Sequence, residues 1–208
     1  AKENVRRSVE ALGIDHEFAT TEAMAAIFRD SLERHSNVCH GCFKTIYTLG
    51  TNRAVELGAP LVVTGLSRGQ LFETRLIPAQ FDEQRFDPDA IDAAVVAARR
   101  SYHRIDDAVR RLMDTDVFDD DALFDRIDYV DFYRYVDVDL TEMLRFLDEE
   151  APWVRPSDTG RSTNCRINAA GIQTHLLEQG YHNYAEPYAW DVRLGHKQRE
   201  QALAELDD

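Results

Sequence analysis

A short apolar run between two turn signals constrains the fold of this chain more than any other feature. Residues 61–64 read Leu-Val-Val-Thr and lead into Gly65, and a helical pattern over 43–57 that stops at Gly58 precedes them. Such a run is typical of a strand whose sheet is covered on both faces. Helix, strand, glycine turn and further helix predict a doubly wound α/β fold, with the turn from Gly65 to Arg68 at the ligand-binding end of the strand.

Apolar spacing predicts the other elements and a division into three parts. Residues 1–78 are expected to form part of the α/β domain, 79–130 an acidic helical insertion with a solvated face, and 131–208 the remainder with an aromatic tail. The pattern predicts helices over 1–12, from Thr20 or Thr21 through Leu32, and over 90–113, 140–149, 167–179 and 197–206, and strands over 14–18 and 133–138.

Composition excludes several classes of protein. The 208 residues are 44% hydrophobic and carry a net charge of −14, which suits one soluble domain and opposes a general nucleic-acid surface. No run approaches the roughly 18 apolar residues of a membrane span, and no signal peptide is visible. Three cysteines in this spacing do not suggest a disulfide scaffold, so we expect a reducing, cytoplasmic setting.

The cysteines are the candidate chemical centre. Cys39 and Cys42 stand three positions apart, the intervening Gly41 is expected at a tight turn, and Cys165 lies far downstream among polar residues. Three thiolates would fill three corners of a metal or iron–sulfur site and leave a fourth position open, as catalytic sites do. Iron–sulfur ligation, zinc binding and a redox pair all remain open at this point. In the zinc interpretation, His35 and His40 would complete the ligand set.

Residues 39–76 resemble the PP-loop ATP pyrophosphatases, and most of all their tRNA thiolation branch that makes 2-thiocytidine. That branch has a CxxC opening a helix, an Ala-x-Glu-Leu-Gly helix end, a strand, a glycine loop and Glu-Thr. The counterparts here are 39–42, 54–58, 61–65 and 73–74. The resemblance implies an adenine-nucleotide α-hydrolase-like fold and a [4Fe–4S] cluster held by Cys39, Cys42 and Cys165.

The activity that this resemblance implies is ATP-dependent sulfur transfer. ATP, with Mg²⁺, would adenylate a substrate oxygen, and sulfur from a donor would then displace AMP. Gly65, Arg68, Glu73 and Arg161 are the expected nucleotide-binding residues, and Lys44 and Arg75 are further candidate cations near the phosphates. The net charge favours a small-molecule or carrier-bound substrate over tRNA.

Two departures from the family stand out. Its Ser-Gly-Gly-x-Asp-Ser phosphate loop does not occur in this sequence, which suggests a fragment without the first strand or a second chain that supplies the loop. Arg68-Gly69-Gln70 replaces the family's Asp-Asp pair after the glycine loop. The alternatives are therefore an amidotransferase or ligase of the same superfamily with structural zinc, or a non-catalytic partner-binding subunit. A homodimer is also open.

The aromatic tail has two interpretations. Residues 181–190 combine aromatic faces with polar tips, and they either seal the cysteine centre from water or offer a stacking platform to an aromatic substrate. His182 and His196 are candidate acid–base residues beside it, because a histidine titrates near neutral pH.

Overall fold

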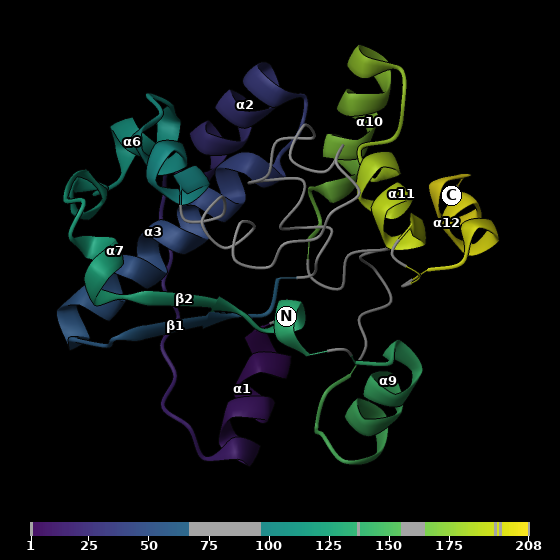
Figure 1. The fold of residues 1–208 in the computed structure, drawn as a ribbon, viewed down its shortest axis with the longest axis horizontal. Helices are drawn as coiled ribbons and strands as arrows, with labels where there is room; N and C mark the ends of the chain where they lie inside the picture. The colour runs from purple at the N-terminus through teal and green to yellow at the C-terminus, as the bar shows by residue number, and fades with distance from the viewer. Residues whose placement is uncertain are drawn as a thin grey trace.

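The computed structural model describes residues 2–66, 97–136, 138–154, 165–193, 195 and 197–207. In this part of the chain, most residues are helical and a small parallel sheet lies beside α3 (Figure 1), so the mixed α/β class is confirmed. The elements are α1 (Lys2–Leu12), α2 (Met24–His35), α3 (Cys39–Leu57), β1 (Leu61–Thr64), a helical stretch over 97–104, α6 (Ala108–Leu112), η2 (Asp116–Asp119), α7 (Leu123–Arg126), β2 (Asp128–Asp131), α8 (Phe132–Tyr135), α9 (Leu140–Glu149), α10 (Asn168–Gln179), α11 (Ala185–Arg193) and α12 (Arg199–Asp207).

The sheet of the described residues consists of β1 and β2, which run parallel with Leu61 opposite Asp128 and Thr64 opposite Asp131. Thr64 and Asp131 therefore stand side by side at the carboxyl ends of the two strands. The side chains of Leu61 and Val63 are 48% and 58% exposed. The expectation that this strand is covered on both faces is thus wrong, and the doubly wound arrangement stays a prediction.

The core lies between α3 and the residues that precede β2. Ala54 of α3 packs with Phe118, Leu123 and Ile127 in one cluster. A second cluster joins Ile27 of α2 to the first residues of α6. The expected acidic insertion therefore contributes side chains to the same core as α3, and each fully buried large apolar side chain contributes about 1.5–3 kcal/mol.

Arginines pair with the acidic run that follows α6. Arg104 contacts Asp121 at 2.6 Å, Arg110 contacts Asp119 at 2.7 Å, and Arg126 contacts Asp120 at 2.9 Å. These pairs lie at the surface, where each is worth at most about 1 kcal/mol. The acidic segment is accordingly a solvated, charge-compensated face rather than an uncompensated anionic one.

Helix capping and strand pairing explain most differences from the expected elements. The helix expected over 90–113 is interrupted before α6, because the side chain of Asp107 accepts the Arg110 N–H at 2.9 Å and starts a new helix. The strand expected over 133–138 is wrong, since pairing with β1 selects residues 128–131 and a helical turn follows. Residues 14–18 form no strand, and the aromatic tail contains α11, which the sequence did not predict.

Candidate functional site

Both paired cysteines lie in the first turn of α3. The apolar pattern placed the start of this helix at residue 43, whereas the family resemblance placed the CxxC at its opening. The helix begins at Cys39, because two side chains satisfy its first amides. The side chain of Asn37 accepts the Cys39 N–H at 2.7 Å, and the Ser31 hydroxyl accepts the Gly41 N–H at 3.0 Å. Residues three apart on a helix share a face, so Cys39 and Cys42 project from the same side of α3.

Gly41 serves helix packing rather than the tight turn that the sequence suggested. It lies inside α3, and a Cβ built there would stand 2.7 Å from Ile27 Cγ2 and 3.1 Å from the Ile27 carbonyl oxygen. Only glycine allows α2 to approach the CxxC segment this closely. Ser31 of α2 is buried in the same contact, and its hydroxyl donates to the Asn37 carbonyl at 2.6 Å. The α2 surface therefore holds the backbone of the motif.

Helix α10 packs near the start of α3 and brings Cys165 into the neighbourhood of Cys42. A Cβ at Gly171 of α10 would stand 3.0 Å from Val38 Cγ2, and Gln179 donates to the Ser36 hydroxyl at 3.2 Å. The chain before α3 thus runs against α10, and Cys165 lies just ahead of that helix. Burial raises the pKa of the Cys42 thiol, and the charge of the neighbouring Cys165 raises it further. Two cysteines separated by more than a hundred residues are therefore electrostatic neighbours.

The thiols suit a soft metal centre in kind, since thiolates are the ligands of iron–sulfur clusters and of zinc. Within the described residues, no group of three or more His, Cys, Asp or Glu side chains is placed so that it could hold a metal ion. The rings of His35 and His40 stack on each other at 4.4 Å between centroids. Burial, with a smaller contribution from His35, lowers the pKa of His40 to about 4, so this imidazole is neutral near pH 7.

Lys44 does not present its charge to a ligand. Its side chain is 1% exposed, and its ammonium donates to Asp107 at 2.7 Å and to the Ile105 carbonyl at 2.9 Å. Burial lowers the pKa of Lys44, and Asp107 opposes that shift. Lys44 therefore ties α3 to the start of α6, and its expected role near phosphates is wrong. The other expected nucleotide-binding side chains, Arg68, Glu73, Arg75 and Arg161, lie outside the described residues, as does His196.

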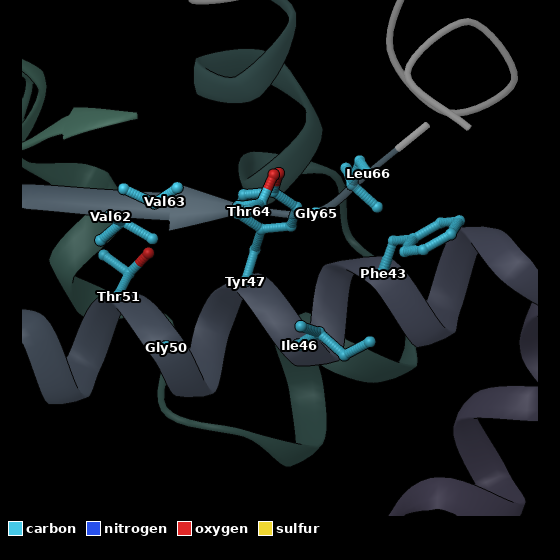
Figure 2. Close-up of a pocket in the computed structure, with 10 residues that line it drawn as sticks. All are labelled: Phe43, Ile46, Tyr47, Gly50, Thr51, Val62, Val63, Thr64, Gly65 and Leu66. Atoms are coloured by element: carbon cyan, nitrogen blue, oxygen red, sulfur yellow. The ribbon is translucent and has the colours of Figure 1, made fainter. Parts of the chain in front are cut away.

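Gly65 lies at the carboxyl end of β1, where a cavity of about 410 Å³ opens between that strand and α3 (Figure 2). Figure 2 shows the Tyr47 side chain rising from α3 to the end of the strand, beside Thr64. Both hydroxyls donate to Oδ1 of Asp131. The glycine turn predicted from the sequence therefore borders a cavity, and Phe43, the residue after Cys42, also lines it.

A buried ion pair supports this end of the sheet. Arg99 Nη2 lies 2.7 Å from Asp131 Oδ2, and the two side chains are 2% and 4% exposed. The guanidinium also lies over the rings of Tyr47 and Tyr129, at 5.2 and 4.8 Å from their centroids. Sequence reasoning missed this network. The only available signal was an aspartate at the end of a strand, and such a residue is as common on a solvated surface.

The aromatic tail packs largely against itself. The Tyr184 hydroxyl donates to Asn168 in the first turn of α10 at 2.9 Å, and the rings of Tyr184 and Tyr188 stack at 5.8 Å. The Tyr184 N–H donates to Nδ1 of His182, which assigns the remaining proton of the neutral ring to Nε2. These contacts place α11 beside α10, the helix that follows Cys165.

The chain matches none of the protein families, curated proteins or solved structures with which it was compared. No helix in the described part of the chain has both the length and the apolar character needed to cross a membrane.

Proposed function

We propose that this chain is part of an ATP-dependent sulfur transferase in which Cys39, Cys42 and Cys165 hold a [4Fe–4S] cluster. The observation that supports the proposal most is the packing of the segment before α3 against α10, which brings Cys165 near enough to Cys42 to raise the pKa of that thiol. Three thiolate ligands would leave one iron of such a cluster without a protein ligand, and the cluster would then supply a binding position for sulfur. The resemblance of residues 39–76 to the PP-loop family supports the use of ATP.

The chain's own residues have separable tasks in this proposal. Asn37 and Ser31 hold the first turn of α3, so the two thiols keep a constant orientation. ATP, with Mg²⁺, would adenylate a substrate oxygen and release pyrophosphate, and sulfur supplied at the sulfide level by the donor would then attack the activated carbon as the C–O bond to AMP breaks. Gly65, Arg68, Glu73 and Arg161 are proposed to face the nucleotide. The substrate is a small or carrier-bound molecule, and a sulfur donor acts with the chain in the cytoplasm.

The proposed fold is a doubly wound sheet of the adenine-nucleotide α-hydrolase type. Its support is the parallel pairing of β1 with β2 and the resemblance of residues 39–76 to that family. The exposed side chains of Leu61 and Val63 are the surface that a further helix would have to cover in such a fold. A preceding segment or a second chain would supply the phosphate loop and the first strand. A homodimer is compatible with this scheme, provided that each copy is completed in the same way.

Metal analysis after anaerobic purification tests the cluster. We expect about four iron and four sulfide per chain, and substantial loss of both in Cys39→Ser, Cys42→Ser and Cys165→Ser. Ser101→Ala, an exposed helical position, is the matched control and should retain the wild-type content. One zinc per chain without sulfide would instead favour the amidotransferase or ligase alternative. Unchanged iron in Cys165→Ser would refute the three-cysteine site.

Binding of ATP tests the second half of the proposal. The chain with Mg²⁺ is titrated with ATP by calorimetry, alone and after addition of any chain that carries the missing phosphate loop. Saturable binding under either condition supports the enzyme. If the cluster assembles but ATP binds under neither condition, the interpretation as a non-catalytic partner-binding subunit is favoured.

A further inference from the structure

A cavity of about 410 Å³ lies between α3 and β1, within the size range of sites for small organic molecules (Figure 2). The cavity is separate from the first helical turn of α3, which contains Cys39 and Cys42, although Phe43 borders both. Its lining residues carry no formal charge. They are Phe43, Ile46, Tyr47, Gly50 and Thr51 from α3, and Val62, Val63, Thr64, Gly65 and Leu66 from β1 and the turn after it.

The walls favour an uncharged ring as the occupant. An ion placed here would lose hydration without meeting a formal charge in the lining, which is costly. Phe43 and Tyr47 offer aromatic surface to a flat ring. Gly50 keeps the helix wall open, because a Cβ at that position would meet no atom within 4 Å. The cavity thus has room along α3 where most residues would place a side chain.

Thr64 supplies a polar contact to the cavity, and its hydrogen bond to Asp131 decides whether the hydroxyl can donate to a ligand. A threonine hydroxyl has one hydrogen, and Thr64 donates it to the carboxylate of Asp131, which can only accept. Asp131 is 4% exposed and held by Arg99 at 2.7 Å, so this acceptor stays in place. The Thr64 oxygen therefore offers lone pairs to a ligand and no hydrogen. Beside Thr64, the cavity therefore favours a ligand that donates.

We propose that this cavity binds an uncharged, planar heteroaromatic ring that carries an N–H group, which donates to Thr64. The aromatic walls contact the faces of the ring. The Thr64 hydroxyl favours a ring whose edge carries a hydrogen-bond donor over one whose edge carries an acceptor. Gly65 lines this cavity and is also proposed above to face the nucleotide, so the inference rests in part on the proposed function and names what the end of β1 binds. Its probes carry no phosphate and need no metal, so it can fail while ATP binding and cluster assembly are both observed.

Indole and benzofuran are the probes, because they share a bicyclic shape and differ in an N–H against an oxygen. The full chain labelled with ¹⁵N is titrated with each, and the amide shifts of residues 61–66 report binding. Indole is expected to bind more tightly by about two- to tenfold, the contribution of one hydrogen bond. In Thr64→Val the hydroxyl is lost while the shape is kept, and the two probes should bind equally.

Gly50→Leu tests the location. Gly50 lines the cavity and a Cβ there meets no atom within 4 Å, so leucine adds bulk to this wall without a clash. Leucine also favours a helix more than glycine does, so the variant is expected to fold. Both probes should lose saturable binding. Arg53→Leu adds leucine to the same helix at an exposed position outside the cavity and should bind as wild type. Equal affinity for the two probes in wild type, or unchanged binding in Gly50→Leu, would overturn the proposal.

Discussion

Two glycines of the same helix should respond to the same substitution with opposite signs. A Cβ at Gly41 would stand 2.7 Å from Ile27 Cγ2 and 3.1 Å from both the Ile27 carbonyl oxygen and Ser31 Cβ. At Gly50 it would meet nothing within 4 Å. Inserting a methyl group into a packed contact costs about 1–3 kcal/mol. Alanine in place of glycine inside a helix contributes about 0.5–1 kcal/mol.

Gly41→Ala is therefore expected to lower the free energy of unfolding by about 1–2 kcal/mol, since the helix gain offsets part of the strain. Gly50→Ala should raise it by about 0.5–1 kcal/mol. Urea denaturation followed by circular dichroism measures both, and each kcal/mol shifts the melting temperature by about 2–4 °C in a chain of this size. If Gly41→Ala were as stable as Gly50→Ala, α2 would not contact the cysteine motif in the way described.

Three further substitutions test other contacts. Asp107→Ala leaves the ammonium of Lys44 buried without its carboxylate, and it should cost about 3–5 kcal/mol in urea denaturation; a loss below that of a surface pair would contradict the buried pairing. Burial raises the pKa of Asp30, but the Ala108 N–H and Arg34 outweigh it and hold that pKa below 3.8. The stability from ionised Asp30 is therefore present above pH 3.8 and lost as pH falls through the lowered pKa. The difference in free energy of unfolding between wild type and Asp30→Asn should accordingly stay constant above pH 3.8 and shrink below it. Ser31→Ala removes two hydrogen bonds at the cysteine motif and should lower the free energy of unfolding by about 1–3 kcal/mol, measured as a lower melting temperature. Ser101→Ala should leave the melting temperature unchanged.

Local sequence signals predicted the elements whose ends carry strong stop residues. Residues 140–149 were expected as a helix and form α9, and α3 ends at Gly58, which adopts the left-handed conformation with φ of 63°. β1 was recognised because four residues of β-favouring composition lie between a proline and a glycine. In these cases the residues that decide the structure are neighbours in the chain, so the sequence was sufficient.

The start of α3 and the position of β2 depended on contacts between distant residues. Ser31 of α2 accepts an amide of the first turn of α3, and no spacing rule within 39–57 contains that information. Residues 128–131 became a strand because β1 was present to pair with them. The neighbouring segment 133–138 has as strong an apolar pattern but lacks such a partner among the described residues.

The sequence by itself determined that this chain contains a mixed α/β structure with a paired thiol motif before a strand and a glycine turn. The tertiary structure alone decided that Cys165 approaches Cys42, that Lys44 is buried against Asp107, and that Tyr47, Thr64 and Arg99 meet at Asp131. The physical reason is that helix caps and turns are local interactions, whereas burial and charge pairing depend on which surfaces the folded chain brings into contact.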